Sequence, residues 1–278
     1  MSTQTFPIAG PINLVCRFGH GSLIVRAEDD LAEASVTLTA RDPESDIVER
    51  TTVEMQGHSL VVHGQKNRGS VFDIPGLAGK FRLRDAMNIE VVVPSGTAMK
   101  IATFAADIAV SGRSGGADIA CGATTVDVEF VDGDLRLRCG TGPIRVGRVS
   151  GSAVVKGGSG EVSIGEVGRD LDVAFGSGSL DLGVAHGSVR TRCGSGPATI
   201  GIAESDVDVT SGSGAVTIGL SPGQQARLDV MTGHGQLRTE MPVEQNRDGS
   251  GRVLTIRART GHGDVLIRRA AQGEQAAS

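Results

Sequence analysis

Apolar and polar residues alternate along the middle of the chain, and the alternation repeats every 18 residues. Two series of glycines share this interval: Gly122, Gly140, Gly158, Gly176, Gly194 and Gly212, and also Gly147, Gly165, Gly183, Gly201 and Gly219. Apolar residues at every second position are typical of a half-buried β-strand. Two columns of equivalent positions are almost wholly apolar: Ile119, Leu137, Val155, Val173, Thr191 and Val209, and Val128, Val146, Ile164, Leu182, Ile200 and Ile218. We expect these columns to point inward and the polar columns between them to face water.

A unit of this length cannot enclose a hydrophobic core alone, so successive units must stack. The simplest stack is a parallel β-solenoid (β-helix), in which each 18-residue unit is one coil and neighbouring strands lie about 4.8 Å apart. The Gly-Ser/Thr-Gly triplets, such as 176–178, are expected at the corners, where the backbone needs positive φ and close approach between coils. The first glycine series above is therefore predicted to be structural.

One outward column carries charges of alternating sign: Asp118, Arg136, Val154, Asp172, Arg190 and Asp208. With coils in register, opposite charges meet on neighbouring coils at three steps of this column. Each exposed ion pair contributes about 0–1 kcal/mol. The ladder is therefore expected to fix the register more than the stability.

The repeat weakens towards both ends of the chain. Residues 1–98 are predicted to form an irregular β cap, with strands at 11–17, 22–27, 34–40, 47–54, 59–63 and 89–93 and a charged insertion at 65–87. Solenoid repeats are expected over 99–269, interrupted by a polar loop at 244–251 and closed by a last unit at 253–268. Residues 270–278 are predicted to be a disordered tail. An uncapped end would promote aggregation or polymer growth.

Composition supports an all-β chain. The sequence has 41 Gly, 7 Phe, no Trp and no Tyr, and this glycine content disfavours helical bundles. The net charge of −5 and the interspersed charges argue against nucleic-acid binding. No apolar run approaches the ~20 residues of a membrane span, and the first residues do not resemble a signal peptide. Four cysteines without metal-binding spacing fit a reducing compartment, so we expect a cytoplasmic protein.

Further motifs connect the chain to a known family. They are the strand end 91–96 (VVVPSG), the repeated S/T-G-x-hydrophobic units, and the closing segment 254–265 (LTIRARTGHGDV). Together they resemble the bacterial putative-adhesin or toast-rack-like β-strand-repeat family, and especially its actinobacterial members. The resemblance spans about residues 10–268. It implies a β-strand-repeat fold and, since the family's role is undefined, no catalytic or ligand residues.

Two sets of residues are candidates for chemistry. Cys121 and Cys139 fall in one inward column on neighbouring coils, so they are either small buried residues or a pair able to form a disulfide. Gly-His-Gly triplets place His20, His234 and His262 at corners, where they are either exposed turn residues or a zinc or pH-sensing site. Neither set keeps a recognised ligand spacing, and no metal or other cofactor is predicted.

Catalytic motifs of the usual kinds are missing from the sequence. It contains no Walker loop and no His-Glu-x-x-His. Outward acidic residues have arginines in neighbouring units, which favours ion pairs over a carbohydrate-cleaving groove; they are Asp118, Asp127, Asp172, Asp181 and Asp208. We therefore predict a non-enzymatic cytoplasmic scaffold that binds an unidentified protein and self-associates through its ends. An envelope-associated adhesin or stress protein and a carbohydrate-active enzyme are the alternatives.

Overall fold

The computed structural model describes residues 1–64, 86–221, 223–240 and 253–270. The predicted insertion at 65–87, the loop at 244–251 and the tail at 270–278 lie wholly or largely outside the described residues. The chain divides into two compact units, Met1–Gly142 and Pro143–Ser278. Every regular element of the described part is a β-strand, and no helix there is long and apolar enough to cross a membrane.

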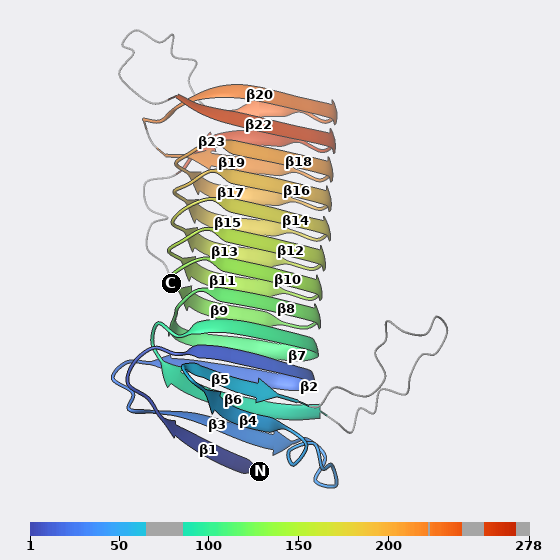
Figure 1. The fold of residues 1–278 in the computed structure, drawn as a ribbon. Helices are drawn as coiled ribbons and strands as arrows, with labels where there is room; N and C mark the ends of the chain where they lie inside the picture. Colours follow the sequence, from blue (N-terminus) through green and yellow to red (C-terminus); the bar gives the residue numbers. More distant parts are fainter. Residues whose placement is uncertain (65–85, 222, 241–252, 271–278) are drawn as a thin grey trace. The chain divides into compact units, whose positions relative to one another are not determined.

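The first unit contains ten strands among its described residues (Figure 1). They are β1 (Ser2–Pro7), β2 (Asn13–Glu28), β3 (Glu33–Ala40), β4 (Thr52–Gln56), β5 (Ser59–His63), β6 (Ala86–Pro94), β7 (Ala98–Ser114), β8 (Ala117–Ala123), β9 (Val126–Val131) and β10 (Leu135–Thr141). Strand β2 runs parallel to β5, β6 and β7. Strand β7 then pairs in parallel with β8 and β9, and β8 with β10. Antiparallel pairing is confined to β1–β3, β3–β6 and β4–β5 among the pairs described.

Two sequence predictions for this unit were incomplete. The runs 11–17 and 22–27 are parts of one continuous strand, β2, and the strand β1 was not predicted. The predicted strand at 47–54 was wrong in its first half, since β4 begins at Thr52. A helical turn occupies that half, because Arg50 N–H donates to the Asp46 carbonyl at 3.1 Å and the two side chains form a 2.7 Å ion pair.

The second unit is a regular stack (Figure 1). Its described strands are β11 (Ile144–Val149), β12 (Ala153–Ser159), β13 (Val162–Val167), β14 (Leu171–Ser177), β15 (Leu180–Ala185), β16 (Val189–Ser195), β17 (Ala198–Ala203), β18 (Val207–Ser213), β19 (Val216–Leu220), β20 (Gln225–His234), β21 (Leu237–Thr239), β22 (Val253–His262) and β23 (Val265–Arg269). One sheet has the order β12-β14-β16-β18-β22-β20 and the other has the order β11-β13-β15-β17-β19-β23-β21, all parallel. The predicted parallel β-solenoid is confirmed.

The register of the stack follows the 18-residue period. Val155 pairs with Val173, and Val173 with Thr191, as the sequence columns require. Every residue of the two apolar columns named above is buried, with at most 3% of its surface exposed. The hydrophobic core therefore lies between the two sheets, and each coil covers the apolar side chains of its neighbours.

The last two coils of the second unit do not stack in chain order. The coil β22–β23 lies between β18–β19 and β20–β21, so that β20 is outermost in its sheet (Figure 1). Electrostatics favours this order. Asp208 pairs in register with Arg257, and Arg257 with Asp229, whereas stacking in chain order would place the two aspartates on adjacent strands. Like charges directly opposite each other destabilise a sheet.

Each corner triplet has two glycines. One of them has the expected positive φ, and the other allows the expected close approach between coils. The second glycine of each triplet has positive φ, for example 132° at Gly178. The first glycine allows close approach, because a Cβ on Gly176 would lie 2.8 Å from the carbonyl oxygen of Gly158 on the preceding coil. Similar contacts of 2.4–2.6 Å would arise at Gly122, Gly140, Gly194 and Gly212. A side chain at these positions would force neighbouring backbones apart.

Candidate functional site

The outermost coil, β20–β21, exposes residues that are buried in every coil beneath it. Leu228 and Val230 of β20 are half-buried, whereas their register partners Ile256 and Ala258 are fully buried. In β21, Leu237 is 48% exposed, although its partner Val265 is fully buried. Within the described part of the chain, β20 pairs with β22 alone and β21 with β23 alone. We call this coil the end coil.

Charged and apolar side chains also gather on the outward side of the end coil. Asp229 lies 3.8 Å from both Arg257 and Arg259 on the coil below. Met231, on the same outward side of β20, is 63% exposed. The end coil therefore has partly exposed apolar side chains at the end of the stack and charges of both signs on its outward side.

The predicted ladder of surface charges is present in part. Arg190 and Asp208 lie 4.0 Å apart on β16 and β18. Asp118 pairs in register with Arg136, but its carboxylate contacts Arg138, two residues further along β10, at 2.8 Å. The Oδ1 atom of Asp172 is buried and makes no hydrogen bond with any residue that the structure describes. Each of these carboxylates has an arginine as a register partner on a neighbouring strand, which supports a structural role.

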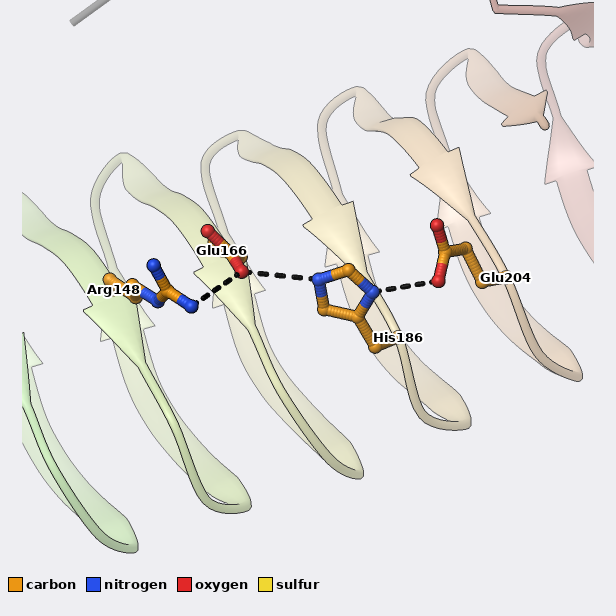
Figure 2. A network of polar contacts seen from close by, with 4 residues as sticks. All are labelled: Arg148, Glu166, His186 and Glu204. Carbon is orange, nitrogen blue, oxygen red and sulfur yellow. Dashed lines mark hydrogen bonds and ion pairs between the residues drawn. The ribbon is translucent and has the colours of Figure 1, made fainter. Parts of the chain in front are cut away.

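A second polar cluster crosses four coils (Figure 2). Arg148 lies 3.3 Å from Glu166, and the same Glu166 oxygen lies 3.1 Å from Nε2 of His186. Nδ1 of His186 lies 2.7 Å from Glu204. The pKa of His186 is raised, chiefly by the hydrogen bond with Glu204; burial opposes this effect, and Glu166 adds to it. Only a doubly protonated imidazole donates to both carboxylates.

Sequence reasoning missed this cluster, which we call the His186 ladder. Arg148 and Glu166 occupy equivalent positions, as do His186 and Glu204, but the two pairs belong to columns two residues apart. The contact between Glu166 and His186 crosses from one column to the other. A search for opposite charges 18 and 20 residues apart would have found it.

The structure brings together two of the three candidate histidines. His234 and His262 are register partners, and their rings stack with centroids 4.7 Å apart and an interplanar angle of 4°. The ring of His20 stacks instead on Phe104, with centroids 5.4 Å apart. Among the described residues, no group of three or more His, Cys, Asp or Glu side chains is placed to hold a metal ion. The histidine pair is therefore a stacking contact between corners.

The candidate cysteines are also brought together. Cys121 and Cys139 are register partners on β8 and β10. All four cysteines of the chain are free thiols, and the other two, Cys16 and Cys193, are buried. Burial raises the pKa of Cys16 to about 12, so that thiol stays protonated and behaves as a small core residue.

Comparison with known proteins finds likeness in solved structures alone. No protein-family model and no curated protein matches the chain. A putative adhesin from Bacteroides fragilis is 13% identical, with 96% of each chain covered and a TM-score of 0.47. A putative cell adhesion protein from Clostridium sporogenes is 12% identical over 96% of this chain and 99% of that one, with a TM-score of 0.27. A putative lipid binding protein from Parabacteroides distasonis is 11% identical over 97% and 96%, with a TM-score of 0.36.

Two of these three neighbours carry names of the putative-adhesin kind, which is the kind of protein that the sequence motifs resemble. The particular resemblance to actinobacterial members of the family stays a prediction.

Proposed function

We propose that the protein is a non-enzymatic cytoplasmic scaffold that self-associates through the end coil, with a second copy of the chain as its partner. The observation that carries this proposal is the half-exposed strand β20, whose apolar positions are covered everywhere else in the stack. An exposed strand edge of this kind recruits another strand. The partner strand must match β20 in both its apolar and its charged positions.

The sequence of β20 is complementary to itself when two copies run antiparallel. Pairing Leu228 with Leu228 of the second copy keeps the apolar positions on one side and places Ala226 opposite Val230. The same register places Arg227 opposite Asp229 twice, once on each side of the two-fold axis. Opposite charges and apolar pairs facing each other stabilise antiparallel strands. A shift by one residue at the axis would instead set Arg227 against itself or Asp229 against itself.

This pairing fits the closed symmetry of most homo-oligomers. A two-fold axis through Leu228 and perpendicular to the sheet places β20 on β20 of the second copy. The contact is isologous, so it stops at a dimer. Leu228 and Val230 become covered, as their equivalents are in the coils below.

Light scattering after size-exclusion chromatography, over a hundredfold range of concentration, tests the proposal. We expect a dimer of twice the 28.5 kDa chain mass. Arg227→Asp should shift the equilibrium towards monomer at least tenfold, because two carboxylates then face each other on each side of the axis. Arg192→Asp, the same charge change on an outward position of β16, is the matched control and should dimerise like the parent chain.

Three results would contradict the proposal. A monomer at all concentrations would remove self-association. A dimer that Arg227→Asp leaves unchanged would place the contact elsewhere. Growth into longer polymers would show a head-to-tail contact in place of a two-fold one. Circular dichroism of each variant checks that its strands are intact.

The cytoplasmic part of the proposal rests on the four free thiols, since secreted proteins usually pair their cysteines. Cell fractionation with an antibody against the chain tests it. Recovery in the soluble cytoplasmic fraction is expected. Recovery with the envelope would favour the adhesin alternative.

A further inference from the structure

Two cysteines occupy equivalent places on neighbouring coils of the first unit. Cys121 lies near the end of β8 and Cys139 near the end of β10, and the two residues are register partners in a parallel pair. Neighbouring strands lie about 4.8 Å apart, and the Cα atoms of disulfides lie about 4.4–6.8 Å apart. Side chains of register partners in parallel strands leave the sheet on the same side. The backbone therefore meets the first requirement for a disulfide.

The two sulfur atoms lie in the space between the strands. Sγ of Cys121 is 3.6 Å from the carbonyl oxygen of Arg138, the residue before Cys139. Sγ of Cys139 is 3.8 Å from the carbonyl oxygen of Gly122, the residue after Cys121. Each sulfur thus approaches the backbone beside the other cysteine.

The two thiols differ in acidity. The pKa of Cys139 is lowered, chiefly by the hydrogen bond that the Cys121 thiol makes to its sulfur and further by backbone hydrogen bonds of Thr141 and Gly140, against the cost of burial. The pKa of Cys121 is raised by the same hydrogen bond and by burial. The thiolate therefore forms at Cys139, next to a thiol that is less buried and can follow it in reaction.

We propose that Cys121 and Cys139 are a redox-active dithiol that closes to a disulfide joining β8 to β10. The oxidant is a low-molecular-weight disulfide, RSSR. The Cys139 thiolate attacks one sulfur of RSSR, forming a mixed disulfide and releasing RS⁻. The Cys121 thiol, on losing its proton, attacks the Cys139 sulfur of that mixed disulfide and releases the second RS⁻. Two thiols lose two electrons and two protons, and RSSR becomes two RSH. A reducing thiol reverses both steps.

Cys193 provides a matched control within the chain. It occupies the equivalent column on β16 and is 6% exposed, against 7% for Cys139. Its register partners are Phe175 and Ser211, so no thiol lies on the strand at either side. Burial and position in the coil are therefore the same, and the adjacent thiol is the difference.

The test treats the reduced full-length protein with excess glutathione disulfide and counts thiols after denaturation. We expect the count to fall from four to two. Trypsin followed by mass spectrometry should then give one species that joins residues 114–136 to residues 139–145 and separates on reduction. Cys139→Ser and Cys121→Ser should abolish that species, whereas Cys193→Ser should keep it. Amide exchange in β8 and β10 should slow on oxidation and recover on reduction.

Several outcomes would overturn the proposal. Retention of four thiols would show that the pair is an inert part of the core. A stable mixed disulfide with glutathione, without the joined peptides, would show that the sulfurs cannot meet. A cross-link between two chains, detected on a non-reducing gel, would assign the reactivity to an intermolecular contact.

Discussion

Nδ1 of His186 lies 2.7 Å from Oε2 of Glu204, on the next coil of the stack. The other ring nitrogen faces Glu166 at 3.1 Å, so this one imidazole joins three coils. Each of the three side chains has about a third of its surface or more in contact with water. The His186 ladder is therefore a surface device whose strength depends on the charge of the imidazole.

The His186 ladder predicts a pH dependence of stability. A pKa raised in the folded chain means that the contribution of His186 is fully present below the ordinary histidine pKa of about 6.5. It fades as the pH rises through the higher folded value. Because the group is well exposed, we expect a change of at most about 1 kcal/mol. Urea unfolding at pH 6 and pH 8.5 should show His186→Gln destabilised more at pH 6.

The control for this measurement is His58→Gln, at an exposed position of the first unit. This variant should unfold with a free energy within about 0.5 kcal/mol of that of the parent chain. A larger effect of His186→Gln at pH 8.5 than at pH 6 would contradict the assigned role of the imidazolium.

Adding a methyl group at a coil corner should loosen the stack. A Cβ at position 176 would lie 2.8 Å from the Gly158 carbonyl oxygen, so Gly176→Ala must push two coils apart. We expect a loss of about 1–3 kcal/mol of unfolding free energy. Ser177→Ala, at the exposed neighbouring position, should change it by less than about 0.5 kcal/mol. Equal unfolding midpoints for the two variants would remove the close-approach role of the glycine.

Register should matter far more than any one surface charge. Inserting one residue after Gly176 shifts the following segment of that coil by one position, which turns its apolar side chains to the opposite face. We expect a large fall in melting temperature or loss of folding. Asp172→Asn removes one charge of the ladder and should change stability by less than about 0.5 kcal/mol. An insertion variant with the same melting temperature as the parent chain would disprove in-register stacking.

Engineered cysteines can test the order of the last coils. In a background without the native thiols, the pair Asp208→Cys and Arg257→Cys should form a disulfide on mild oxidation, because the two positions are register partners. The pair Asp208→Cys and Asp229→Cys should not, since a strand lies between them at about 4.8 Å per step. Mass spectrometry of tryptic peptides identifies the bond. The opposite result would mean that the coils stack in chain order.

Much of the repeat region was predictable because its information is local and periodic. Alternation within each unit assigns Leu137 or Leu182 to the core, and the constant interval assigns the register, since a slip would turn the apolar side chains towards water. The corner glycines follow from the same interval. The first unit was harder to predict, because β2 and β7 run through their corners as single strands and the turn at 47–50 depends on a local ion pair.

The candidate sites depended on information beyond the period. The columns placed Cys121 beside Cys139, in agreement with the structure, whereas the contact between His234 and His262 did not follow from them. They did not bring Glu166 to His186, because that contact joins two columns through the reach of the side chains.

The amino-acid sequence by itself determined the all-β solenoid, its inward columns and its corners, because these depend on which residues recur at a fixed spacing. The tertiary structure alone decided which strand lies at the end of the stack. Placing β22 beneath β20 sets Arg257 between two aspartates and leaves Leu228 and Leu237 partly exposed. Two coils compete for the position next to β18 and β19, and interactions between coils decide which of them takes it. A repeat in the sequence does not show which of these interactions is the stronger.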